Sequence, residues 1–289
     1  LGEMWLCRTR PSRALRACAP TLWRSLTTQG AGSQEPKLVI VDGRRSVELV
    51  RAELALNVKV HASRGVELLA AGRQGVAVAL RATAQVQLGR RRKMAFTLAP
   101  ASAAELAEAG LEAPDQTSGG ISAANELETA PGNERRGFRL SFPANGSLPS
   151  HSSQKLPDEE AITKVLPVGQ SSRFLPLAKA IATNVARLPE DRVVAVETAL
   201  LGKAKNTWTR THLMAQAIAQ AHQWQVSPAK DNFMPRPFQC VAKELIKESQ
   251  TVATDGKGVK DFQVLRLLLL PLGSTSVGHQ ATASTAARP

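Results

Sequence analysis

Two stretches near the end of the chain alternate between apolar and polar residues, and a polar run separates them. FQCVAKELIKE (238–248) and FQVLRLLLL (262–270) each read as a β-strand, because a period of two is typical of a strand with one buried face. The polar run contains an Asp-Gly pair at 255–256, which supplies the positive φ angles of a tight hairpin turn. The pattern predicts a long β-hairpin with Lys257 and Lys260 at its tip.

The chain repeats itself. VELLAAGR (66–73) matches VETALLGK (196–203), since both read Val-Glu, four residues, glycine and a base. Upstream, KLVIVDGRRSVELV (37–50) matches KVLPVGQSSRFLPL (164–177). Self-similarity of this kind indicates a duplicated structural unit.

Each copy is predicted to contain a strand, a helix, a second strand, a second helix and a final pair of strands. In the first copy these elements are strands 37–41 and 66–71, helices 47–63 and about 75–88, and strands within 93–101 and 135–144. In the second copy they are strands 163–168 and 192–201, helices 175–187 and 207–223, and the hairpin. This βαβαββ order predicts an α+β fold with two helices on one face of each four-stranded sheet.

The predicted domain boundaries follow from the repeat. An acidic insertion at 101–134 replaces the short turn in the first copy, and SAAELAEAG within it predicts a short helix. The proposed segments are a first domain at 34–100 plus 135–145, a linker at 146–160, a second domain at 161–272 and a disordered tail at 273–289.

The charge is unevenly distributed. The 289 residues carry a net charge of +13, and residues 34–100 and 161–289 contribute +7 and +8. Residues 101–160 form an acidic block of −6 between them. Two basic blocks favour a polyanionic partner, most commonly a nucleic acid.

The first 33 residues contain five arginines, and from Met4 they contain no acidic residue. An arginine-rich, acid-free N-terminus predicts a transit peptide, and we expect the mitochondrial matrix, with the plastid as the alternative. No apolar run approaches the ~20 residues of a membrane span, so we expect no membrane partner.

Candidate catalytic chemistry is sparse. His212 and His222 lie ten residues apart on one predicted helix and therefore point in different directions. Cys240 is the only cysteine outside the leader and is predicted to be a buried core thiol. The turns GRQG and GKAKNT lack the full phosphate-loop pattern. We expect neither an enzyme nor a cofactor.

The order and spacing of these motifs resemble the Alba superfamily, and most closely its branch of bacterial stage V sporulation protein S. VELLAAGRQGVAVALRATAQV carries the resemblance in the first copy, and VETALLGKAKNTWTRTHLMAQAIAQ with the hairpin carries it in the second. Another small nucleic-acid module, such as the C-terminal domain of a bacterial translation initiation factor, is the alternative. The resemblance implies that helix-entry loops and hairpin tips contact a nucleic-acid backbone. It points to Arg44, Arg45, Arg73, Lys203, Lys205, Lys257 and Lys260.

Further basic candidates are Arg90, Arg91, Arg92 and Arg210. Aromatic residues make up 4% of the chain and Trp208 is predicted to be buried, so we expect recognition of backbone rather than of stacked bases. The expected function is an accessory subunit of the mitochondrial ribosome that contacts rRNA and neighbouring ribosomal proteins. DNA binding, a free nucleoid or RNA-processing factor, and a structural subunit of another mitochondrial complex are the alternatives.

Overall fold

The computed structural model describes residues 35–86, 93–111, 137–144, 159–189, 191–200, 204–226, 236–248 and 261–272. Residues 1–35 form one unit and 36–289 a second, and the fold described below is that of the second. The predicted transit peptide, most of the acidic insertion, most of the linker, the tip of the hairpin and the predicted tail lie outside the described residues.

The elements of the first half follow the predicted order. They are β1 (Lys37–Val41), α2 (Val47–Val60), β2 (Val66–Ala71), α3 (Gly72–Gln85), β3 (Ala95–Pro100), the short α4 (Ala103–Glu108) and β4 (Gly137–Phe142). The second half repeats this order. Its elements are η4 (Glu159–Ala161), β5 (Ile162–Pro167), α5 (Phe174–Ala186), β6 (Val193–Ala199), α6 (Ala204–Val226), β7 (Phe238–Glu248) and β8 (Asp261–Pro271).

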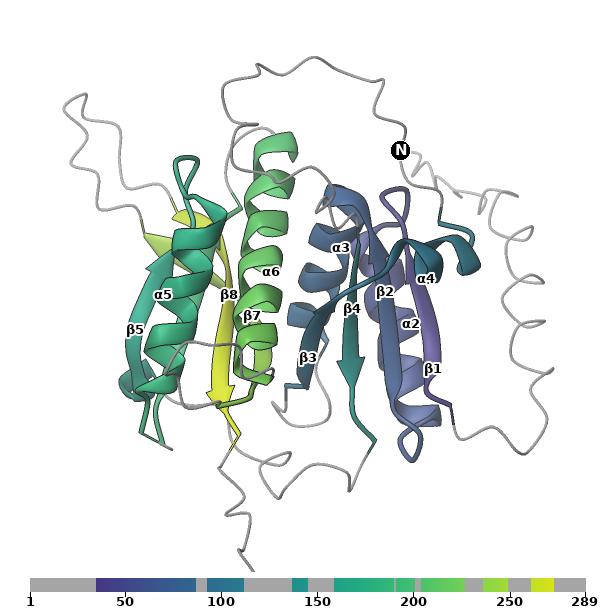
Figure 1. The fold of residues 1–289 in the computed structure, drawn as a ribbon. Coiled ribbons are helices and arrows are strands. Elements are labelled where there is room, and N and C mark those ends of the chain that lie inside the picture. Colours follow the sequence, from purple (N-terminus) through teal and green to yellow (C-terminus); the bar gives the residue numbers. More distant parts are fainter. Residues whose placement is uncertain are drawn as a thin grey trace, which may run out of the picture. The chain divides into compact units, whose positions relative to one another are not determined.

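All eight strands belong to one mixed sheet with the order β1-β2-β4-β3-β7-β8-β6-β5 (Figure 1). The fold therefore agrees with the predicted α+β class. Within each half the first two strands are parallel and the others pair antiparallel. Two separate four-stranded sheets were expected, whereas antiparallel pairing of β3 with β7, at Phe96 and Cys240 among others, makes the sheet continuous.

The repeat extends to single side chains. With 37–50 aligned on 164–177, Asn57 of α2 falls on Asn184 of α5. Each asparagine donates its side-chain amide to the carbonyl four residues earlier, at 2.9 Å to Glu53 and 2.6 Å to Ala180. The first helices of the two halves are therefore equivalent in register as well as in position.

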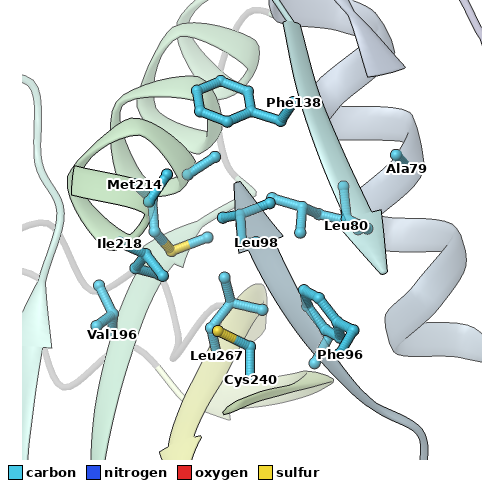
Figure 2. Packing of buried hydrophobic residues seen from close by; sticks show 14 of the residues in the cluster. Ala79, Leu80, Phe96, Leu98, Phe138, Val196, Met214, Ile218, Cys240 and Leu267 are labelled. Carbon is cyan, nitrogen blue, oxygen red and sulfur yellow. The ribbon is translucent and has the colours of Figure 1, made fainter. Parts of the chain in front are cut away.

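One hydrophobic core serves both halves. Phe96 and Leu98 of β3 point into the same cluster as Cys240 of β7 and Met214 and Ile218 of α6 (Figure 2). Helices α3 and α6 lie next to each other over this junction (Figure 1). Because buried side chains from both halves pack together, we expect the halves to unfold as one cooperative unit.

A polar contact reinforces the same junction. Glu244 of β7 accepts a hydrogen bond from Arg81 Nε at 3.0 Å and another from Gln85 Nε2 at 3.0 Å. Both donors belong to α3 of the first half. The two carboxylate oxygens of one strand residue thus hold a helix of the other half.

Two element boundaries differ from the prediction. Helix α2 was expected to reach residue 63 and ends at Val60, because His61 begins a turn that closes at Gly65. Gly65 has a φ of 82°, and a Cβ there would lie 2.8 Å from the carbonyl oxygen of Phe142. Helix α3 begins at Gly72, three residues earlier than expected, because the positive φ of Gly72 turns the chain directly from β2 into the helix.

Candidate nucleic-acid interface

Strand direction brings the two predicted contact segments of the first half, and the start of the acidic insertion, to one end of its sheet. The parallel strands β1 and β2 end there, followed by loop 42–46 and the start of α3. Gly137, which begins β4, pairs with Ala71, which ends β2. The connection between β3 and β4 therefore begins at the same end of the sheet. We call this end, with loop 42–46 and the start of α3, the first loop end.

The second half has the corresponding arrangement. Parallel β5 and β6 lead into loop 168–173 and the start of α6. Ala199 at the end of β6 pairs with Val264, and the hairpin pairing continues to Glu248 and Asp261 at that same end. The described ends of β7 and the start of β8 thus lie at the same end of the sheet as these loops, and this set of segments is the second loop end.

Arg44 and Arg73 are exposed at the first loop end. Arg73 lies in the first turn of α3, which has no acidic residue and no side-chain cap. The partial positive charge of uncapped helical N–H groups then adds to the guanidinium charge. This combination favours an anion such as a phosphate.

Arg45 makes contacts within the chain itself. Its guanidinium donates to the carbonyl of Ile40 at 2.6 Å and forms an ion pair with Glu53. Lys37 donates its backbone N–H to Gly65 before β2, so by strand alternation the carbonyl of Ile40 faces the outer edge of β1. Arg45 therefore covers an acceptor on an edge strand, which disfavours pairing with a further strand.

The opposite edge of the sheet is protected as well. Pro167 of the edge strand β5 has no backbone N–H that could pair with a further strand. One half uses a proline and the other an arginine for the same purpose.

The second loop end also carries basic residues. Lys205 is exposed in the first turn of α6, which contains no acidic residue. Arg173 is exposed at the N-cap of α5, another helix start without an acidic residue or a side-chain cap. Arg210 is half-buried farther along α6. The other predicted cations of this half, Lys203, Lys257 and Lys260, lie outside the described residues.

Residues 90–93, which read Arg-Arg-Arg-Lys, form a basic cluster after α3, and only Lys93 of this cluster is described. Arg90, Arg91 and Arg92 lie outside the described residues. The ammonium of Lys93 donates to the carbonyl of Ala84 at the end of α3, and burial lowers its pKa. Lys93 is therefore occupied in capping a helix.

Cys240 and the two tryptophans of α6 differ in how deeply they are buried. Cys240 is buried, as predicted, and burial raises the pKa of its thiol. Trp208 was expected to be buried and is only half-buried, because it lies near the start of α6. Trp224, which the sequence reasoning missed, is 37% exposed near the other end of this helix.

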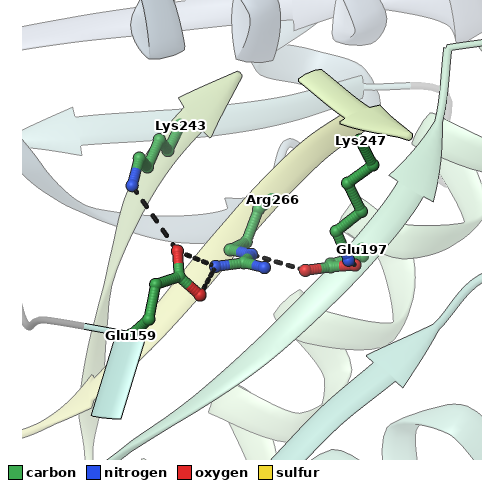
Figure 3. A network of polar contacts seen from close by, with 5 residues as sticks. All are labelled: Glu159, Glu197, Lys243, Lys247 and Arg266. Atoms are coloured by element: carbon green, nitrogen blue, oxygen red, sulfur yellow. Dashed lines mark hydrogen bonds and ion pairs between the residues drawn. The ribbon is translucent and has the colours of Figure 1, made fainter. Parts of the chain in front are cut away.

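The structure contains a buried polar network that was not predicted from the sequence. Arg266 of β8 bonds Glu197 of β6 at 2.5 Å and Glu159 of η4 at 2.6 Å (Figure 3). Lys247 and Lys243 add a contact each, at 2.5 Å to Glu197 and 3.7 Å to Glu159. The side chains of Arg266 and Glu197 are only 5% and 8% exposed. Each therefore neutralises the charge of the other in a place that is largely shielded from water.

The first half has a counterpart of this network. Arg139 of β4 forms ion pairs with Glu67 of β2 and with Glu105 of α4, and Ser141 donates to Glu67 at 3.1 Å. Glu67 and Glu197 are the glutamates of the repeated Val-Glu motif. The repeat in the sequence marked both glutamates, but it did not show which arginine forms an ion pair with each of them. Each network fastens a short helix, α4 or η4, to the sheet.

Stability should depend on pH through Glu159. Its hydrogen bond with Arg266 lowers the pKa of this carboxyl, so the contact stabilises the fold above about pH 4.5 and is lost as the pH falls below that value. We expect Glu159→Gln to lower the urea midpoint at pH 7, and the difference from the wild type to shrink progressively as the pH falls below about 4.5. A difference that stays constant across this range would contradict the assignment.

Within the described ranges, no group of three or more His, Cys, Asp or Glu residues could hold a metal ion. In the same ranges no helix is long and apolar enough to cross a membrane. Comparisons with protein-family models, with curated proteins and with solved structures found no match.

Proposed function

We propose that this chain is a non-enzymatic structural protein that binds the RNA backbone through its two loop ends. The observation that carries the proposal is the charge of three helix starts. Helices α3, α5 and α6 each begin without an acidic residue and with an exposed base, Arg73, Arg173 and Lys205. Of the four long helices in the described part of the chain, only α2 has an acid, Glu48, in its first turn.

Phosphate contacts of this kind hold a protein in register on a nucleic acid without reading its sequence. Few aromatic side chains of the described residues are exposed, which favours the same mode because stacking on bases needs such side chains. The tandem βαβαββ order and the repeated strand order support the finer assignment of two Alba-like domains. The basic blocks of +7 and +8 favour RNA of a large assembly as the partner.

The proposed location is the mitochondrial ribosome, where the chain would act as an accessory subunit beside neighbouring ribosomal proteins. Co-sedimentation with mitochondrial ribosomal subunits in a high-magnesium lysate tests this step. A chain that remains free, or that follows the nucleoid, would contradict the ribosomal assignment.

Two double variants test the loop ends. Arg44→Ala with Arg73→Ala, and Lys257→Ala with Lys260→Ala, should each weaken binding to all RNAs alike. Each lost phosphate contact should flatten the log–log salt dependence of the association constant by about 0.7–0.9. Filter binding or fluorescence anisotropy at several salt concentrations measures both effects.

The matched control removes the same charge elsewhere. Lys164 and Lys179 are exposed, and neither lies at a loop end. Lys164→Ala with Lys179→Ala should leave the slope unchanged. Equal slopes for all three double variants would mean that binding reflects net charge alone, and the loop ends would lose their assigned role.

A further inference from the structure

The outer face of α2 carries an apolar stripe. Leu49, Leu56 and Val60 are 61%, 49% and 57% exposed, and Ala52 between them is also exposed. The spacings of three, four and four residues place these side chains along one line of the helix. A continuous apolar line at the surface is typical of an interface.

The duplicated half provides an internal comparison. The positions of α5 that align with the stripe are Pro176, Lys179, Thr183 and Arg187. Two of these are exposed cations, whereas the buried faces of the two helices are apolar in both halves apart from Asn57. The fold of the repeated unit therefore does not require exposed apolar side chains at these positions. A contact made by the first half alone accounts for the stripe on α2.

We propose that the stripe binds a second copy of this chain, with the two α2 helices packed antiparallel about a two-fold axis. In this orientation Leu49 of one copy faces Val60 of the other, and Ala52 leaves room for Leu56. Large side chains thus meet small ones along the line, as packed helices require. A two-fold contact uses the same patch twice and closes at a dimer.

The charges beside the stripe favour this orientation. Glu48 lies in the first turn of α2 and Lys59 in the last, and both are exposed. Antiparallel packing brings Glu48 of each copy near Lys59 of the other, whereas parallel packing brings like charges together. The patch is therefore complementary to itself, which is the feature that selects a second copy over an unrelated protein.

Pairing through the sheet edges is a weaker route to a dimer. Arg45 covers the outer carbonyl of Ile40 in β1, and Pro167 interrupts the outer edge of β5. A helix pair of this length forms a small interface, so we expect a dissociation constant in the micromolar range.

A matched pair of single variants tests the surface in the full-length chain. Leu56 and Leu175 are both 49% exposed, but Leu175 lies on α5 away from the stripe. Sedimentation equilibrium should show a dimer for the wild type and for Leu175→Asp. Leu56→Asp should weaken the dimer by at least about tenfold, because a carboxylate would be buried in the stripe. Circular dichroism should show that both variants are folded.

Charge reversal tests the orientation. Glu48→Lys and Lys59→Glu should each weaken the dimer, and the double variant should restore it. A wild type that stays monomeric across the micromolar range would overturn the proposal, and so would a dimer that Leu56→Asp leaves intact. Failure of the double variant to recover would overturn the antiparallel arrangement. None of these results depends on RNA, so they are independent of the proposed function.

Discussion

Replacing Phe96 with alanine is expected to lower the free energy of unfolding by about 3–5 kcal/mol, the usual cost of removing a large buried aromatic side chain. Phe96 is fully buried on β3, where it pairs in register with Cys240 of β7 and its ring lies 5.6 Å from that of Phe142. The vacated volume would lie where the two halves meet. The loss should therefore reach both halves, although the change is made in only one.

Tryptophan fluorescence measures this coupling. Beyond the predicted leader, the chain has only Trp208 and Trp224, and both lie in α6 of the second half. In urea, the fluorescence midpoint of Phe96→Ala should fall together with the midpoint from far-UV circular dichroism. Coincidence of the two probes indicates a single cooperative transition.

A surface variant provides the control. Leu38 lies on β1 and is 43% exposed, so Leu38→Ala should change the midpoint far less. If Phe96→Ala left the fluorescence transition in place while part of the circular dichroism signal moved, the halves would unfold independently. The core shared by the two halves would then not act as one unit.

Much of the secondary structure could be predicted because it depends on local patterns. The predicted ranges of β1, β2 and β7 coincide with the observed strands, since apolar runs and alternation mark each of them clearly. The helices were found as well, with errors confined to their ends. At α3 the error arose because a glycine before the helix allowed an earlier start.

The junction between β3 and β7 could not be predicted in the same way. A period of two shows which face of a strand is buried, but it does not show which strand lies beside it. Antiparallel partners 144 positions apart, such as Phe96 and Cys240, leave no local trace. For the same reason the core shared by the two halves could not be predicted from local patterns.

For the candidate site, only the positions of the basic residues along the chain could be predicted, and not their contacts. The sequence placed Arg44, Arg45 and Arg73 together, and the structure does bring their segments to one loop end. It could not show that Arg45 is occupied by Glu53 and Ile40, because such a contact depends on the packing of α2 against β1. Glu67 and Glu197 were visible as repeated letters, but their role required the neighbouring strand.

Arg266→Ala is expected to destabilise the chain by about 3–5 kcal/mol, the typical result of removing one partner from a buried ion pair. The loss would leave Glu197, whose side chain is 8% exposed, with Lys247 as its remaining cation among the contacts described here. Glu159 would also lose its two contacts of 2.6 Å to the guanidinium, and η4 would be held less firmly. Urea denaturation at pH 7 gives the change directly.

The first half supplies the matched control for this effect. Arg139 has the same two-carboxylate arrangement with Glu67 and Glu105, but its side chain is 35% exposed. Because water screens a pair of this kind, Arg139→Ala should cost only about 1 kcal/mol. Adding Glu197→Gln to Arg266→Ala should then recover part of the stability, since the unpaired buried charge is removed together with its partner. Equal losses for Arg266→Ala and Arg139→Ala, or no recovery in the double variant, would show that side-chain packing rather than buried charge makes Arg266 important.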